Sequence, residues 1–250
     1  MARTTADGAD EASEVASGDA KALPAEAVNG IPVSKPGAEN ILVIVAHPDD
    51  EVFGPGGTMA RYAAEGKNIF AMIFSYGEGS HPWIQPELLA KTRVRESRAA
   101  ADMLQAKQTV FLGFKEGRFA DEVKNKRFKT RFKELIKSIK PSKIFTHSRR
   151  DLHADHRAVN RITLDTLRTM RSNCEVYTFE IWNFLFVQPG NHTRLIVDVT
   201  DQFSTKIAAL RKFHSQYMSL GILLPIVYLR ALFAGYEYGY RYAEAFTRVQ

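Results

Sequence analysis

The chain has 250 residues, of which 45% are apolar and 25% are charged, within the usual range for a globular protein with a full hydrophobic core. This composition excludes collagen-like proteins, wholly disordered chains and small domains stapled by disulfides. Cys174 is the single cysteine, so the sequence offers no internal disulfide and no cysteine-based zinc finger. We therefore expect a cytoplasmic location.

Charge is distributed unevenly along the chain. Residues 1–40 hold 3 basic and 7 acidic side chains, a net charge of −4, whereas residues 41–250 hold 31 and 21, a net charge of +10. A basic body favours anionic ligands or surfaces, although solvated helix faces explain the same excess of lysine and arginine.

Residues 1–40 are predicted to form a disordered tail, and residues 41–250 a single domain. The first segment is rich in alanine, glycine, serine and acidic residues, contains three prolines and is almost free of aromatic side chains. It therefore cannot bury enough apolar surface to offset its ordering entropy. It also lacks the uninterrupted apolar core of a secretory signal.

From Ile41 onward, short β-branched runs alternate with longer amphipathic stretches. We expect strands over 41–46, 69–75, 109–112, 143–146, 175–179 and 195–199, with a closing edge strand at 242–249. Helices are expected near 58–65, 86–105, 123–140, 155–171 and 202–214. This alternation predicts an α/β fold, a three-layer Rossmann-like mostly parallel sheet with helices on both faces.

The most apolar stretch covers residues 220–234. It is shorter than a comfortable membrane span and contains Pro225 and Arg230, so we expect a buried or interface helix and no transmembrane segment. Self-association into a homo-oligomer through this stretch and a peripheral membrane contact of the basic body both stay open.

One imidazole and three carboxylates follow the first predicted strand, at His47, Asp49, Asp50 and Glu51. Ligands bind at the carboxyl ends of strands in open α/β sheets, so this concentration is informative. Capping of the next helix explains one acidic residue but not three, and it does not explain the histidine. Adjacent carboxylates repel one another unless a cation or solvent compensates their charge.

Glycines at 54, 56 and 57 come next. They lack the spacing of a dinucleotide fingerprint, and no Lys followed by Ser or Thr completes a phosphate-binding loop. We therefore expect these glycines to let the following helix pack closely against the site.

A second polar cluster follows the fourth predicted strand and contains His147, Asp151, His153, Asp155 and His156. The two clusters together can supply two neutral imidazoles and one carboxylate, the ligand set of a catalytic zinc site that keeps one position open for water. Iron(II) or cobalt can occupy such a site as well.

Two motifs, AHPDDE at residues 46–51 and HADHR at residues 153–157, occur in this order. With them the sequence resembles the LmbE-like or PIG-L-like family of N-acetylglucosamine de-N-acetylases, and the resemblance extends over nearly all of residues 41–250. Further pieces of the resemblance are Arg93 before Glu96, Asp198-Val199-Thr200 with Lys206, Ser215-Gln216, and Tyr242-Ala243-Glu244-Ala245-Phe246.

The resemblance implies one zinc ion per chain. The implied metal ligands are His47, Asp50 and His156. It also implies that Asp49 is the general base for the attacking water. His153 would stabilise the oxyanion or protonate the leaving amine, and Asp155 would keep His153 charged and oriented.

The resemblance places Arg93 at the substrate, and an ion pair with Glu96 on the helix surface is an equal alternative. Residues 79–86 resemble a substrate-side loop, in which Trp83 could stack on a sugar face. His81 and Trp83 could instead simply anchor this loop.

The expected function is a zinc-dependent hydrolase that removes the N-acetyl group from an N-acetylglucosamine-type sugar or glycoconjugate and releases acetate. The alternative is a non-catalytic protein that binds a sugar or a lipid-linked sugar on the same scaffold. No nucleic-acid partner is expected, because the basic run at residues 124–133 is more typical of a solvated helix face. The loops at the rim of the site are expected to determine which group attached to the sugar the protein accepts.

Overall fold

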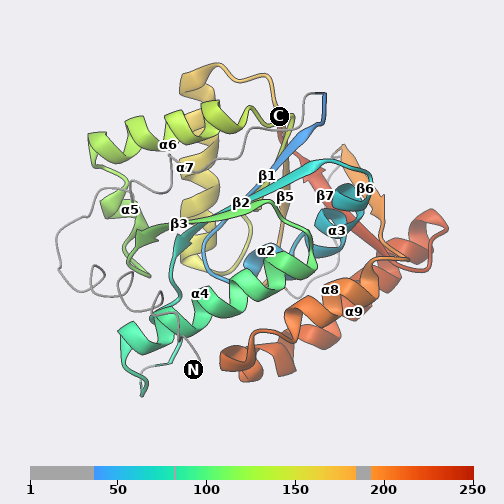
Figure 1. Cartoon of the computed structure of the whole chain (residues 1–250). Helices are drawn as coiled ribbons and strands as arrows, with labels where there is room; N and C mark the ends of the chain where they lie inside the picture. Colours follow the sequence, from blue (N-terminus) through green and yellow to red (C-terminus); the bar gives the residue numbers. More distant parts are fainter. Residues whose placement is uncertain (1–36, 82, 184–192) are drawn as a thin grey trace, which may run out of the picture.

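The strands form one mixed sheet in a computed structural model that describes residues 37–81, 83–183 and 193–250. Their order is β3-β2-β1-β4-β5-β7-β6 (Figure 1). The strands are β1 (Asn40–Val45), β2 (Asn68–Ser75), β3 (Gln108–Phe114), β4 (Lys143–His147), β5 (Glu175–Phe179), β6 (Arg194–Asp198) and β7 (Ala243–Arg248). Strands β1 to β5 run parallel, and β7 runs antiparallel to both β5 and β6. The predicted fold class is confirmed.

Helices cover both faces of the sheet (Figure 1). On one face lie α2 (Asp50–Phe53), α3 (Gly56–Ala64), α4 (Pro86–Met103), α8 (Phe203–Leu210) and α9 (Tyr217–Tyr238). On the other lie α5 (Phe119–Glu122), α6 (Lys126–Ile139) and α7 (Ala154–Met170). A hydrophobic core lies on each face of the sheet, and side chains of β1 enter the two cores alternately. Val43 points into the first core and Leu42 into the second. Strand β1 is therefore apolar on both faces, as a doubly covered parallel strand requires.

The predicted closing edge strand is wrong in its position. Strand β7 lies between β5 and β6, with pairs such as Thr178↔Thr247 on one side and Ile196↔Ala245 on the other. Strand β6 therefore forms the edge of the sheet. The order of strands in a sheet depends on the path of the connections that cross the sheet. The periodicity of a single strand carries no information about that path.

The predicted helix over 123–140 corresponds to α6, which begins at Lys126, and the separate short helix α5 ends at Glu122, before the predicted range. Asn125 ends the connection between them, because its side chain accepts a hydrogen bond from the Arg127 N–H at 2.8 Å and caps α6. The predicted tail falls largely outside the described residues, which begin at residue 37. The assignment of residues 41–250 to one domain stays a prediction.

Helix α9 is longer than the predicted 220–234. It runs over Tyr217–Tyr238 and packs on the core through Leu223, Val227 and Ala231. With the 3-10 turn before it, the run His214–Tyr238 is long and apolar enough to cross a membrane by length and composition, and 22% of its most apolar window is buried inside the molecule. The expected shortness of this segment is therefore wrong.

A buried ion pair ties the end of the chain to the loop after β1. Lys206 Nζ lies 2.6 Å from Glu244 Oε1 and donates to the Gly54 carbonyl at 2.8 Å. Glu244 also accepts from the backbone N–H groups of Gly57, at 2.9 Å, and Thr58, at 2.7 Å, at the start of α3. A Cβ on Gly57 would meet Glu244 Oε1 at 2.9 Å, so glycine permits the close packing that the sequence predicted.

We predict that Lys206→Met lowers the free energy of unfolding by about 3–5 kcal/mol, because it leaves the Glu244 carboxylate buried without its cation. Urea denaturation followed by circular dichroism measures the change. Arg168→Met is the matched control, because it removes a pair with Asp165 whose side chains are 78% and 59% exposed. Equal effects of the two substitutions would contradict a stabilising role for the buried pair.

Candidate metal centre

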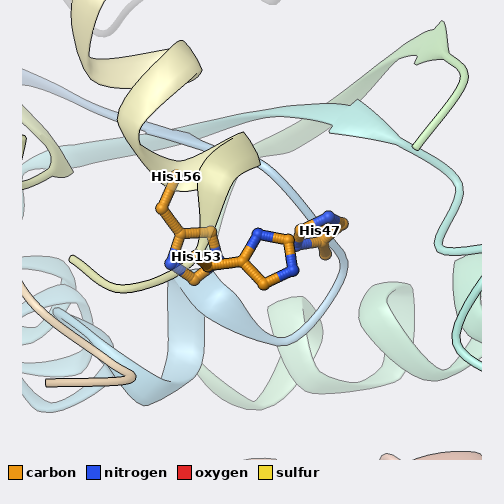
Figure 2. A group of neighbouring side chains, drawn as sticks. All are labelled: His47, His153 and His156. Atoms are coloured by element: carbon orange, nitrogen blue, oxygen red, sulfur yellow. The ribbon is translucent and has the colours of Figure 1, made fainter. Parts of the chain in front are cut away.

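The carboxyl ends of two neighbouring strands bring the predicted clusters together. Strands β1 and β4 are parallel and paired, with Ile44 opposite Thr146, so the segments that follow them leave the same edge of the sheet. Figure 2 shows the rings of His47, His153 and His156 gathered at this edge, the first from the loop after β1 and the other two from the start of α7.

One carboxylate oxygen, Asp50 Oδ2, lies at the centre of the cluster. It is 3.3 Å from His47 Nδ1, 3.3 Å from His156 Nε2 and 3.3 Å from His147 Nε2. Four ligands at about 2.0–2.1 Å around a tetrahedral zinc ion lie about 3.3–3.4 Å from one another. The contacts of Asp50 with His47 and His156 therefore have the spacing of ligands that share one metal ion.

The chemistry of the donor set also fits a metal ion. Among the described residues, two groups of three have donor atoms within 4.8 Å of one another, namely His47 with His153 and His156, and Asp50 with His147 and His156. The predicted ligands His47 and Asp50 thus belong to different groups, which share His156. His156 belongs to both groups, and its buried Nε2 makes no hydrogen bond within the described residues. A buried imidazole lone pair without a donor is what a metal ligand offers. This cluster could bind a metal ion.

His147 belongs to the cluster, although no role was predicted for it from the sequence. Its ring is fully buried and stacks on that of His156, with centroids 3.8 Å apart. Its Nε2 accepts a hydrogen bond from the Ala46 N–H at 3.1 Å. The signal that could have identified it is its place as the last residue of β4, at the carboxyl end of the strand.

The imidazoles differ strongly in charge. Burial opposes a proton on His47, but contacts with Asp155 and Asp50 outweigh it and raise the pKa to about 10. Burial opposes a proton on His156 as well, and Asp50 and Asp151 raise its pKa to about 9. Burial and the neighbouring His156 lower the pKa of His147 to about 4, so this ring is neutral.

Asp49 combines an unusual backbone with a perturbed carboxyl group. Its φ is 109°, outside the regions that L-residues adopt easily, and such strain is found at functional sites. Burial raises the pKa of its carboxyl to about 7, against the opposing charge of Arg93. A carboxyl with a pKa near neutrality suits a general base.

Arg93 is buried beside Asp49 rather than paired with Glu96 on the surface. Its Nη2 lies 2.9 Å from Asp49 Oδ2, and its Nη1 donates to the Gly77 carbonyl at 3.2 Å. Gly77 has a φ of 76°, which glycine adopts without strain, and this turn brings its backbone against the guanidinium. Glu96 instead accepts from the backbone N–H of Ser215 at 2.9 Å. The alternative of a surface ion pair is therefore wrong, and contact of Arg93 with substrate stays a prediction.

The implied contact between Asp155 and His153 takes a different form in the structure. The Asp155 carboxylate lies 3.4 Å from His47 Nε2 and accepts from the Gly117 N–H at 2.9 Å. His153 accepts the Asp155 backbone N–H at its Nδ1, 3.2 Å away, because it is the N-cap of α7. Burial, together with His47 and His156, lowers the pKa of His153. Asp155 therefore contacts His47, and its expected role in keeping His153 charged stays a prediction.

The predicted substrate-side loop adjoins the first turn before α9. His81 Nε2 lies 2.5 Å from the Ser215 carbonyl oxygen, and Gln216 Nε2 donates to Ser80 Oγ at 3.0 Å. Trp83, whose ring centroid is 5.2 Å from that of His81, is 72% exposed. His81 therefore anchors the loop, whereas Trp83 presents its ring to solvent. Residue 82 of this loop lies outside the described residues.

Comparison with known proteins identifies a family and relatives. The model of the family described as PIG-L, GlcNAc-PI de-N-acetylase, matches residues 42–167. The chain is 29% identical over 182 residues to the uncharacterized deacetylase YaiS of Escherichia coli, covering 71% of this chain and 91% of that protein. It is 41% identical over 91 residues to a 1D-myo-inositol 2-acetamido-2-deoxy-alpha-D-glucopyranoside deacetylase of Thermobifida fusca, but the match spans only 32% of this chain and 31% of that protein.

Two solved structures share the fold over most of their length. The N,N'-diacetylchitobiose deacetylase of Pyrococcus horikoshii superposes with a TM-score of 0.72 at 20% identity, covering 91% of this chain and 90% of that one. The 4-carboxy-2-hydroxymuconate hydratase GalB of Pseudomonas putida also gives 0.72 at 20% identity, covering 85% of this chain and 96% of that one. At this identity the two likenesses establish the fold alone.

We predict that Zn²⁺ binding to metal-free protein at neutral pH releases about two protons, because His47 and His156, with pKa values near 10 and 9, must be neutral to act as ligands. Apparent affinity should therefore rise with pH. Isothermal titration calorimetry in buffers of different ionisation enthalpy measures the proton count. Release of no protons would contradict the involvement of both imidazoles.

Asp155→Asn is predicted to lower zinc affinity by about 10–100-fold, because the carboxylate that orients His47 is lost. Competition with a chromogenic chelator measures the affinity without an activity assay. Asp165→Asn, on the exposed side of the same helix, is the control and should bind zinc as the wild type does. Unchanged affinity in Asp155→Asn would show that His47 needs no such support.

Proposed function

Because the chain belongs to the PIG-L family of GlcNAc-PI de-N-acetylases, we propose that it is a zinc-dependent amide hydrolase that removes the N-acetyl group from an N-acetylglucosamine-type sugar or glycoconjugate and releases acetate. The observation that carries the proposal is the meeting of two distant acid-and-imidazole clusters around Asp50 Oδ2. Several carboxylates and imidazoles buried this close together need a positive charge to compensate them, and a bound divalent cation supplies it.

The proposed ligands of the ion are His47, Asp50 and His156. Two neutral imidazoles and one carboxylate leave a dication with a net positive charge and, in tetrahedral geometry, one position for water. When bound, the ion would polarise the amide carbonyl and lower the pKa of that water to about 7. Asp151 would support this arrangement, because its Oδ1 lies 3.1 Å from His156 Nδ1 and orients that ring.

Asp49 is the proposed general base. Its carboxylate belongs to the same loop as two of the proposed ligands and has a pKa raised to about 7 by burial, so it can accept a proton from the attacking water near neutral pH. Arg93, 2.9 Å away, holds the carboxylate in one orientation. Glu51 Oε2 accepts the Asp49 N–H at 2.9 Å and fixes the backbone of the same residue.

His153 is the proposed donor to the oxyanion and to the leaving amine. Its Nδ1 accepts a backbone N–H, so in the neutral ring the proton resides on Nε2, which can donate to a bound substrate. Its ring centroid lies 4.9 Å from that of His47 and 4.7 Å from that of His156, within reach of a group held between them. One such donor contributes about 3 kcal/mol to stabilisation of the transition state.

The proposed substrate class rests on the names of relatives. The Thermobifida fusca relative and the Pyrococcus horikoshii neighbour are both named as deacetylases of N-acetylated amino sugars. An amino sugar of this kind is therefore the proposed substrate, and the loop of residues 79–86 with its exposed Trp83 is the proposed rim that selects the attached group. A cytoplasmic location is part of the proposal and is supported by the single free thiol of Cys174.

A non-catalytic sugar-binding protein is the alternative. The same fold in GalB is named as a hydratase, so the scaffold alone does not determine the reaction. The presence of Asp49 and His153 beside the three proposed ligands favours an enzyme. A binding protein needs neither a base with a pKa near 7 nor a spare hydrogen-bond donor.

We predict that zinc-loaded protein releases primary amines from a panel of N-acetylated amino sugars, and that Asp49→Asn lowers kcat by about 10²–10⁴-fold while retaining one zinc ion. His156→Ala should lose both zinc and activity. Fluorescamine detection of amines and atomic emission measure the two properties. Asp102→Asn, near the end of α4 and away from the site, is the control.

Full activity and full zinc content in His156→Ala would refute the ligand assignment. A wild-type protein that binds these sugars without metal and releases no amine would instead support the non-catalytic alternative.

A further inference from the structure

Helix α9 exposes a continuous apolar face. The side chains on this face, here called the α9 face, are Met218, Ile222, Leu229, Leu232 and Tyr236. Their spacing of four, seven, three and four residues places them on one side of an α-helix. Within the described ranges all five are exposed, from 44% for Leu232 to 89% for Tyr236. The opposite side of the helix packs on the core through Leu223, Val227 and Ala231.

Further exposed apolar side chains lie on segments that lead to the candidate metal centre. Tyr217 and Trp83 are exposed by 70% and 72%, and the segments that carry them are joined by the hydrogen bond of Gln216 to Ser80. Leu88, at the start of α4, is also exposed. The loop that carries Trp83 begins at Gly77, whose carbonyl accepts from Arg93 beside the candidate base. The α9 face and Trp83 thus lie on segments that are hydrogen-bonded to each other, and the segment of Trp83 begins at the rim of the site.

Charged side chains lie before and after α9 along the chain. Arg211 and Lys212 lie exposed before α9, and Arg241 lies exposed after it. The helix itself contains two charged residues, Arg230 and Glu237. Arg230 donates to the backbone carbonyl groups of Glu180 and Asn183, so its charge is directed at the protein. Glu237, near the end of α9, lies 3.7 Å from Arg194, which compensates its charge. Exposed basic side chains thus precede and follow the α9 face along the chain.

We propose that the α9 face and Trp83 dock on an anionic lipid bilayer, with α9 lying in the plane of the interface. Apolar and aromatic side chains then enter the boundary between headgroups and acyl chains, while Arg211, Lys212 and Arg241 meet the anionic headgroups. Tyr217 and Tyr236, near the two ends of the helix, lie at the level that tyrosine prefers in membranes.

The charge of the body favours a bilayer over a second copy of this chain. Residues 41–250 carry a net charge of +10, so pairing two such bodies through a helix flanked by basic side chains brings like charges together. An anionic membrane instead attracts the same groups. The packing of one side of α9 on the core also favours in-plane contact, because a helix that crosses the bilayer would have to leave that core. This proposal does not depend on the deacetylase assignment.

Flotation of the full chain with vesicles tests the proposal. We expect binding to vesicles of phosphatidylcholine and phosphatidylglycerol at low salt, and binding at least about tenfold weaker to phosphatidylcholine alone or at high salt. The triple variant Met218→Gln, Ile222→Gln, Leu229→Gln should bind anionic vesicles at least about tenfold more weakly. Val249→Gln removes an exposed apolar side chain outside this surface and should bind as the wild type does.

Fluorescence gives a second readout. The chain has two tryptophans, and Trp83 is the exposed one. Binding should shift its emission to shorter wavelength, and brominated lipid should quench it. In Trp83→Phe, which leaves the half-buried Trp182, both changes should be lost or strongly reduced.

Three results would overturn the proposal. They are absence of wild-type binding to anionic vesicles, equal binding by the triple variant, and a wild-type dimer in analytical ultracentrifugation that the triple variant converts to monomer without any vesicle binding. The last result would assign the α9 face to a second copy. Thermal unfolding and amine release from a soluble sugar, both expected to be unchanged in the triple variant, separate this outcome from failure to fold and from failure of the proposed function.

Discussion

Convergence of imidazole nitrogens on one carboxylate oxygen is the interaction on which the site depends. Asp50 Oδ2 lies 3.3 Å from nitrogens of His47, His147 and His156, in a region almost closed to water. A buried carboxylate oxygen and imidazole nitrogens packed this closely need a positive charge between them to offset the repulsion of their lone pairs. Protons on His47 and His156 can supply it, and a divalent cation can replace them. Proton and metal therefore compete for the same place, which makes metal binding sensitive to pH.

The rest of the fold holds the loop after β1 in a shape that its own sequence does not favour. Asp49 has a positive φ, and two contacts support this conformation, namely Arg93 on its carboxylate and Glu51 on its N–H. Behind the loop, Lys206 and Glu244 join α8, β7 and the start of α3 in one buried network. Residues late in the chain thus set the geometry of a site built from residues 47–156.

The candidate metal centre is connected to the proposed membrane-docking surface through the loop after β2. Arg93 links the candidate base to the turn at Gly77, and the loop that follows carries Trp83 to the beginning of α9. A surface that adsorbs to anionic lipid next to the site would place the mouth of the metal centre close to the headgroups. The basic excess of residues 41–250, which solvated helix faces also explain, would then assist adsorption.

The sequence by itself determined the parallel α/β core, because doubly buried strands and amphipathic helices carry local periodicities, and it located both polar clusters at strand ends. Only tertiary structure decided what those clusters touch. Asp155 lies on His47 rather than His153, Arg93 lies on Asp49 rather than Glu96, and β7 lies inside the sheet. These contacts depend on long-range packing, because each side chain meets residues from a distant part of the chain. Local patterns in one sequence do not show which of several possible partners a side chain contacts.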